Sequence, residues 1–260
     1  MTAQDIAVSR NGNVATIEIR RPPLNFFDLT LIRAIASALE GFDTEPEIRA
    51  VVLCAEGKAF CAGADFSSPD NATPAETDLL DTTDHLYLEA VRIFRCKKPI
   101  VAAVQGAAIG GGLGLALAAD FRVACPEARF AANFTRLGFH PGFGLTVTLP
   151  EVIGKNNAEL MFYTSRRVSG EEAHRMGLAN VLTTKEKLRE AAHALAAEIA
   201  ECSPLGLLST RATLRGDLAD RVHAATRHEL AEQQRLRQTA DFAEGVRSTA
   251  ERRPANFISK

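Results

Sequence analysis

The chain has 260 residues, of which 46% are hydrophobic and 24% are charged, and its formal net charge is −2. This composition is typical of a globular protein long enough for one large domain with a terminal extension. It gives no basic footprint for nucleic acid, and no apolar run approaches the ~20 residues that a membrane-spanning helix needs, so we expect neither nucleic acid nor membrane as a partner.

The N-terminal segment is predicted to form a β-hairpin followed by a helix. Hydrophobic residues alternate with polar ones over 6–10 and 14–20, and Asn11-Gly12 between them is a strong turn signal. Asp28 can cap a helix whose apolar residues recur along one stripe as far as Leu39.

Strands and helices alternate along the remainder of the chain. Apolar runs predict strands near 50–54, 100–104, 121–124 and 179–182, with helices between them. The polar, acidic stretch 67–82 is predicted to be a mobile loop.

Three capping signals predict helix starts in the second half of the chain. Ser169-x-x-Glu172 and Thr183-x-x-Glu186 are capping boxes, and Ser203-Pro204 matches an N-cap followed by the first helical residue. From there to the C-terminus the pattern is helical and rich in charge.

The cysteines indicate a reducing compartment, and we expect a cytoplasmic protein. Their number is odd, and none forms a Cys-x-x-Cys pair. We therefore expect free buried thiols. The first residues also lack the charged and apolar regions of a signal peptide. No spacing of histidines and carboxylates predicts a metal site.

A glycine-rich junction at 105–114 is the most informative stretch of the sequence. It reads Gln-Gly-Ala-Ala-Ile-Gly-Gly-Gly-Leu-Gly and lies between an apolar strand and an apolar helix. Such a turn can bring bare backbone N–H groups and a positive helix end to a negative charge. It can equally serve close packing of the strand against the helix. The P-loop and the dinucleotide fingerprint are both excluded by the residues that follow.

A second motif, Gly57-Lys-Ala-Phe-Cys-Ala-Gly-Ala-Asp65, decides between these interpretations. With the glycine-rich junction, it resembles the crotonase superfamily of enoyl-CoA hydratase/isomerase-like proteins. Arg21-Pro22 with Leu24-Asn25, the segment 165–179 and the tail 242–257 extend the resemblance over nearly the whole chain.

The resemblance implies an α/β fold built as a spiral of repeated strand-strand-helix turns. It implies an acyl-CoA-binding core over 1–200 and a C-terminal helical region over 201–260 that forms a homotrimer or homohexamer. The implied substrate is an acyl-CoA of the kind used in fatty acid metabolism, and no cofactor beyond that coenzyme A is expected.

The resemblance also implies an oxyanion hole made by the N–H groups of Ala64 and Gly111. Two such donors can stabilise the negative charge that develops on a thioester oxygen, each by roughly 3 kcal/mol. The residues implied in binding substrate and CoA are Leu24, Ala62, Ala64, Asp65, Phe66, Gly111, Phe134 and Gly142. Asp65 is as well explained as a helix cap or structural anchor.

The sequence departs from the hydratases at both of their catalytic glutamates. The matching positions are Gly114 and Phe134, neither of which can exchange a proton. The aspartate nucleophile of the dehalogenases would fall near Gly142 and is also missing. We therefore expect weak or absent hydration and a more apolar pocket, which the glycine at 114 makes roomier.

His140, in a loop rich in glycine and proline, is the candidate replacement for the missing acid or base. Its titration near neutral pH suits that role, but a structural histidine bonded to nearby backbone is an equal alternative. Tyr87 and Glu89 lie on a helix that borders the acyl pocket in relatives, and Glu89 is also typical of a solvated helix charge. Cys61 is interpreted first as a small core residue.

The sequence leaves the reaction open between hydration, isomerisation, decarboxylation, thioester hydrolysis and C–C cleavage of the retro-aldol type, although isomerases usually keep the second glutamate and hydratases use both. The alternative is a catalytically silent acyl-CoA-binding homologue, and RNA binding, known for one relative, is disfavoured by the charge. The basic residues that bind the CoA phosphates are equally open. The candidates are Lys58, Lys97, Lys98, Arg166, Arg167, Arg252 and Arg253, because Ser67 and Pro22-Pro23 occupy the positions where relatives place lysines.

Overall fold

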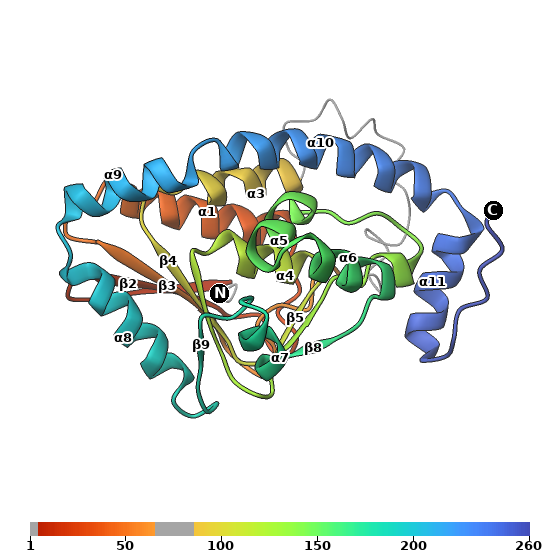
Figure 1. The fold of residues 1–260 in the computed structure, drawn as a ribbon, viewed down its shortest axis with the longest axis horizontal. Coiled ribbons are helices and arrows are strands. Elements are labelled where there is room, and N and C mark those ends of the chain that lie inside the picture. The colour runs from red at the N-terminus through yellow and green to blue at the C-terminus, as the bar shows by residue number, and fades with distance from the viewer. Residues whose placement is uncertain (1–4, 66–85) are drawn as a thin grey trace.

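The computed structural model describes residues 5–65 and 86–260, and its centre is a six-stranded sheet in the order β1-β2-β3-β4-β6-β9 (Figure 1). The strands are β1 (Ile6–Asn11), β2 (Val14–Ile19), β3 (Ala50–Ala55), β4 (Ile100–Val104), β6 (Phe121–Ala124) and β9 (Val181–Leu182). β1 pairs antiparallel with β2 through the predicted turn, and the other neighbours are parallel. The strands predicted from the apolar runs are confirmed, although the last is only two residues long.

Helices cover both faces of the centre of this sheet, which explains why β3 and β4 are apolar and buried along their whole length. The helices that cover it are α1 (Leu29–Asp43), α3 (Leu86–Arg95) and α8 (Leu188–Glu201). Alternate β3 residues divide between two cores: Val51 and Leu53 pack with the α1 side, and Val52 and Cys54 with α8. Figure 1 shows α1 and α3 on one side of the sheet and α8 on the other.

A second, three-stranded sheet carries the glycine-rich junction. Its strands are β5 (Ala107–Ile109), β7 (Arg129–Ala131) and β8 (Val168–Ser169), in the order β5-β7-β8. The sequence analysis did not predict this sheet, because strands of two or three residues leave no readable periodicity. Around it lie α4 (Gly111–Ala118), the 3-10 helix η1 (Thr135–Leu137), α5 (Leu145–Ile153), α6 (Lys155–Thr164) and α7 (Gly170–Arg175).

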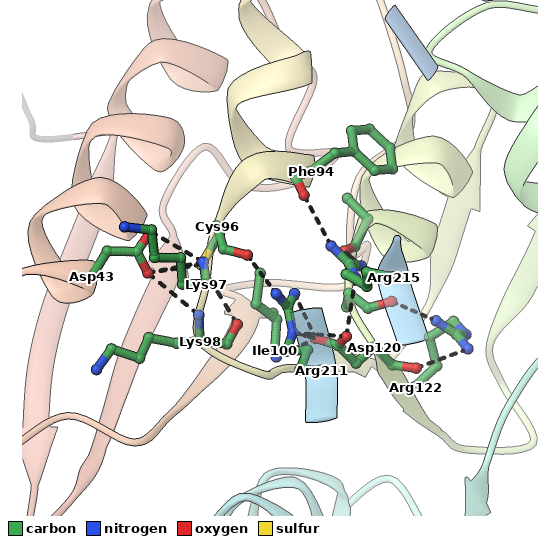
Figure 2. Close-up of polar contacts among 12 residues, drawn as sticks. Asp43, Phe94, Cys96, Lys97, Lys98, Ile100, Asp120, Arg122, Arg211 and Arg215 are labelled. Carbon is green, nitrogen blue, oxygen red and sulfur yellow. Dashed lines mark hydrogen bonds and ion pairs between the residues drawn. The ribbon is translucent and has the colours of Figure 1, made fainter. Parts of the chain in front are cut away.

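The C-terminal helices pack back onto this core. They are α9 (Pro204–Arg215), α10 (Leu218–Arg237) and α11 (Ala240–Glu251), and α10 lies along α1 and α3 in Figure 1. Figure 2 shows Arg211 and Arg215 of α9 around Asp120, whose carboxylate accepts from Arg211 at 3.0 Å and lies 3.2 Å from Arg215 Nε. Asp120 also accepts the Ile100 N–H of β4 at 2.8 Å, so one carboxylate joins α9 to the sheet.

Most of the predicted helix starts are confirmed, and one is wrong. Asp28 accepts the N–H of Leu31, and Ser169 forms the full capping box. Ser203 caps α9. α8, however, begins at Leu188 without a side-chain cap. Thr183 cannot cap that helix, because its N–H donates to Ala124 of β6 and holds it in line with β9.

Candidate active site

The two glycine-containing motifs lie side by side. Cys61 forms a parallel bridge with Ala108: its N–H donates to Ala107 O at 2.9 Å, and its carbonyl accepts the Ile109 N–H at 3.1 Å. Gly63 follows with φ 87°, and a Cβ there would lie 2.8 Å from Ile109 O. A glycine is therefore required at 63 both by the backbone conformation and by the close approach.

Ala64 and Gly111 present backbone N–H groups at this junction. A Cβ on Gly63 would lie 3.8 Å from Gly111 N, so the residue before Ala64 reaches the start of α4. Gly111 is the first residue of α4, where an N–H has no partner within the helix. Among the hydrogen bonds between described residues, neither N–H has a protein acceptor. As far as the described residues extend, both donors are thus available for an oxygen atom as partner.

Close packing also explains the glycine run. A Cβ on Gly112 would lie 2.0 Å from Cys61 O, and one on Gly106 would lie 2.0 Å from Lys58 O. The packing interpretation is therefore correct for these two glycines. Gly111 combines both features, because a Cβ there would lie 2.2 Å from Cζ of Phe27 while its backbone N–H stays at the start of α4.

Phe143 fills the space beside Gly114, so the expectation of a roomier pocket there is wrong. A Cβ on Gly114 would lie 2.7 to 2.8 Å from three atoms of Phe143. The Phe143 ring is 1% exposed and lies 5.7 Å from the Phe27 ring and 6.1 Å from the Tyr87 ring. Instead of a carboxylate or a void, an aromatic side chain occupies the position next to Gly114.

The backbone around Phe143 is held in an unusual conformation by a buried carboxylate. Phe143 and Gly144 have φ of 64° and 69°. Glu229 of α10 is fully buried; it accepts the Gly144 N–H at 2.8 Å, and the N–H and hydroxyl of Thr146 at 3.1 and 2.6 Å. Burial raises the pKa of Glu229, while the bonds from Thr146 and Gly144 oppose that rise. α10 therefore fixes the loop that carries Phe143.

A second aromatic ring lies beside the glycine-rich junction at Phe134. A Cβ on Gly110 would lie 3.6 Å from Cζ of Phe134. Phe134 is 3% exposed and meets the Phe139 ring edge-on at 5.5 Å. An aromatic ring therefore lies at the position that the resemblance matches to the hydratases' second glutamate.

The matching of whole sequences and structures identifies the family. The model of the enoyl-CoA hydratase/isomerase family matches residues 9–260. The chain belongs to this family. Crotonyl-CoA hydratase of Syntrophomonas wolfei is 29% identical over all of both chains, and carnitinyl-CoA dehydratase of Salmonella typhi is 33% identical over 82% of this chain and 81% of its own.

Solved structures show that the fold is that of the crotonase superfamily. An enoyl-CoA hydratase/isomerase from Pseudoalteromonas atlantica superposes with a TM-score of 0.87 at 30% identity, covering 98% of this chain and all of its own. An enoyl-CoA hydratase from Mycobacterium avium gives a TM-score of 0.85 at 25% identity over 98% and 99% of the two chains. The α/β spiral expected from the resemblance is confirmed.

His140 lies against α10. Its Nδ1 is 2.8 Å from Pro141 O, and its ring meets His228 at 5.7 Å. The carbonyl of His140 accepts from Gln233 of α10 at 2.8 Å. These contacts are those of a structural histidine, and the acid–base role stays a prediction.

Tyr87 and Glu89 of α3 differ in their surroundings. A Cβ on Gly142 would lie 2.5 Å from the Tyr87 hydroxyl oxygen, which accepts from Gln233 at 3.3 Å. Burial raises the pKa of Tyr87. Glu89 is 8% exposed and pairs with Arg92, so the solvated interpretation of this carboxylate is wrong.

The remaining substrate-binding candidates lie along the first motif. The Ala62 N–H donates to Leu24 O at 3.0 Å. This bond joins the N-terminal segment that contains Leu24 to the first motif. Asp65 is half-buried, and Phe66 lies outside the described residues. Cys61 is fully buried, and burial raises its pKa to about 12, as expected for an unreactive core thiol.

Sequence reasoning missed Phe143, Glu229 and Gln233. A Phe between two glycines was the available signal for Phe143. Glu229 and Gln233 gave none, because they stand in a charged helix that looks solvated throughout. Within the described ranges, no three His, Cys, Asp or Glu side chains could hold a metal, and no helix is long and apolar enough to span a membrane.

Proposed function

We propose that the chain is an enzyme of acyl-CoA thioesters that stabilises negative charge on the thioester oxygen. The observation that carries this proposal is that Gly63, the residue before Ala64, packs against the start of α4 at Gly111, while neither the Ala64 nor the Gly111 N–H has a protein acceptor among the described residues. The names of two relatives, crotonyl-CoA hydratase and carnitinyl-CoA dehydratase, support the substrate class. Fixed donors that require no reorganisation are the main source of catalysis on such oxygens.

The same site is a poor hydratase. Adding water to an enoyl thioester requires a group that activates the water and one that protonates carbon. Glycine at 114 and phenylalanine at 134 supply neither, and Phe143 occupies the adjoining space. We therefore propose that this chain hydrates crotonyl-CoA weakly or not at all.

Decarboxylation of a 2-carboxyacyl-CoA is the reaction that this geometry supports best. In that reaction the bond to the carboxylate carbon breaks, CO₂ leaves, and the electron pair passes into an enolate whose oxygen the two N–H groups stabilise. A proton from water then completes the acyl-CoA. No side chain has to remove a proton, and an apolar surrounding favours loss of the charged carboxylate. Hydrolysis and retro-aldol cleavage each need a general base. The ring of His140, the candidate base, lies beside Pro141 O and His228 of α10, so these two reactions are less well supported.

A catalytically silent acyl-CoA-binding protein is the second candidate. The aromatic surroundings of the junction favour it, because Phe27, Phe134 and Phe143 bring no proton donor to the oxyanion site. Such a protein would keep the thioester site as a binding site alone.

Turnover of malonyl-CoA and crotonyl-CoA, each followed beside a control enzyme of known activity, separates these proposals. Conversion of malonyl-CoA to acetyl-CoA and CO₂ with no hydration of crotonyl-CoA supports the decarboxylase. Tight binding of both thioesters without turnover supports the silent binder. Rapid hydration of crotonyl-CoA contradicts the proposal that Gly114 and Phe134, in place of the two glutamates, make hydration weak or absent.

A further inference from the structure

The ring of Phe143 lies along the first turn of α4, where the proposed oxyanion donor is. A Cβ on Gly111 would lie 3.5 Å from Cδ2 of Phe143, and one on Gly114 would lie 2.7 Å from Cδ1. Residues three apart share a face of a helix, so the ring covers the side of α4 that runs from Gly111 to Gly114. An acyl group whose oxygen meets the Gly111 N–H adjoins this same surface.

A second ring continues this surface beside Gly111. Cζ of Phe27 lies 2.2 Å from the place of a Cβ on Gly111, and the Phe27 N–H donates to Gly63 O at 3.0 Å, which fixes this residue to the first motif. The rings of Phe27 and Phe143 are 4% and 1% exposed, and their centroids are 5.7 Å apart. The two rings therefore form one continuous aromatic wall beside Gly111 and Gly114.

The ring of Phe143 has little freedom to move aside. The rings of Tyr87 and Phe94 lie 6.1 and 6.4 Å from it, centroid to centroid. Phe143 has φ 64°, and the N–H of the next residue, Gly144, donates to the buried Glu229 at 2.8 Å. Because a packed interior resists added volume, even one extra methyl group against this ring is unfavourable.

The carbon next to the thioester carbonyl, C2, is the part of an acyl group that this aromatic wall affects most. C2 is bonded to the carbonyl carbon, so it lies only about 2.4 Å from the oxygen that the N–H groups hold. An acyl group with one carbon substituent on C2 can turn that substituent away from the wall. With two carbon substituents on C2, one of them stays on the side of the wall.

We propose that Phe143 is a specificity-determining residue that restricts the site to acyl-CoA thioesters unbranched at C2. This inference rests on the proposed function, because it takes the thioester oxygen to lie at the Gly111 N–H. It narrows the proposed substrate class. Malonyl-CoA carries its carboxylate as the single carbon substituent on C2 and is accepted, whereas methylmalonyl-CoA carries two and is disfavoured.

The test compares the binding of butyryl-CoA and isobutyryl-CoA to the full chain by titration calorimetry. The two thioesters have the same composition and differ only in the branch at C2, and neither has to react. We expect the wild type to bind butyryl-CoA about tenfold or more tightly than isobutyryl-CoA. In Phe143→Ala we expect this ratio to fall to about twofold or less, because the lost ring leaves room for the branch.

The matched control is Phe42→Ala, which removes a ring that is 2% exposed near the end of α1, beside Arg10. We expect this control to keep the wild-type ratio. Phe143→Leu, which removes the ring and keeps an apolar side chain, provides the same comparison if Phe143→Ala does not fold.

A wild-type ratio near one overturns the proposal, and so does an unchanged ratio in the Phe143 variants. Loss of discrimination in Phe42→Ala as well as in Phe143→Ala also overturns it, because general loosening then explains the change. Failure of the wild type to bind either thioester overturns the proposed function too. Binding of both thioesters without discrimination overturns the specificity alone.

Discussion

The Ala64 N–H is the donor that one substitution can remove, because proline has no amide hydrogen. We predict that Ala64→Pro lowers kcat/KM on the thioester that the wild type turns over by roughly a hundredfold, equivalent to about 3 kcal/mol of transition-state stabilisation. Ala64→Ser keeps the N–H and serves as the matched control. Steady-state kinetics checks this, and equal activity of the two variants contradicts a role for this donor.

Gly114 and Phe143 depend on each other because their atoms would overlap if a Cβ were added at 114. We predict that Gly114→Ala lowers the free energy of unfolding by about 1–3 kcal/mol through overpacking. In the Gly114→Ala/Phe143→Ala variant the loss is smaller than the sum of the single losses, because the clash is absent. Urea unfolding of the four proteins measures this coupling, and additive losses would show that Phe143 does not occupy the space.

At the residue scale, the sequence indicates that backbone N–H groups can face a negative charge at the glycine-rich turn, and the resemblance assigns the donors to Ala64 and Gly111, which stays a prediction. The ring beside Gly114 is not predictable in this way, because Phe143 reaches it only through the three-dimensional path of its loop. A missing side chain in the sequence therefore predicted space that a distant residue fills.

Helix α10 affects the site through the buried Glu229. Burial raises the pKa of this carboxyl, so the folded chain holds its proton more tightly than the unfolded chain. Its contribution to stability is full below the unfolded pKa of roughly 4.3 and is lost as pH rises through the folded pKa. We predict that the free energy of unfolding declines over this window in the wild type, and that Glu229→Gln flattens the decline.

Urea unfolding at a series of pH values measures this free energy, and Glu201→Gln is the control at an exposed position. The Glu229→Gln variant also loses stability at every pH, because an amide cannot accept from Gly144 and Thr146 with both of its ends. A pH profile identical to that of the wild type would contradict the raised pKa.

Asp120 joins α9 to the sheet through two arginines that are mostly buried (Figure 2). We predict that Asp120→Ala lowers the free energy of unfolding by about 3–5 kcal/mol, because it leaves Arg211 and Arg215 without their carboxylate. The control is Glu151→Ala, which breaks an exposed pair with Arg221 and costs ~1 kcal/mol or less. Similar losses for the two variants in urea unfolding would show that the pairs of Asp120 with Arg211 and Arg215 contribute little to stability.

At the element scale, long amphipathic or apolar segments are predictable and short or long-range features are not. Asp28 and Ser169 cap helices as predicted, because capping is local. Thr183 fails because pairing with Ala124 outweighs the local capping pattern. The strands β5, β7 and β8 escape prediction because pairing, not periodicity, defines them.

The oligomer is the property of the whole molecule that the resemblance implies, and α9 carries two exposed apolar side chains, one near each end, that an oligomer could cover. Leu205 and Leu214 are 80% and 82% exposed in the single chain. We predict a homotrimer or homohexamer, with the mass lowered in Leu205→Asp/Leu214→Asp because burying two carboxylates between subunits is costly. Light scattering measures the mass, and Val8→Asp is a control at an exposed apolar position on β1. A monomeric wild type contradicts the prediction.

The most direct test of the account is the spectrum of a bound chromophoric thioester, such as 4-dimethylaminocinnamoyl-CoA. Its absorbance moves to longer wavelength when hydrogen bonds polarise the thioester carbonyl, whether or not any reaction follows. The N–H groups of Ala64 and Gly111 predict a clear shift to longer wavelength on binding to the wild-type chain. Saturable binding with an unshifted spectrum would contradict the oxyanion site.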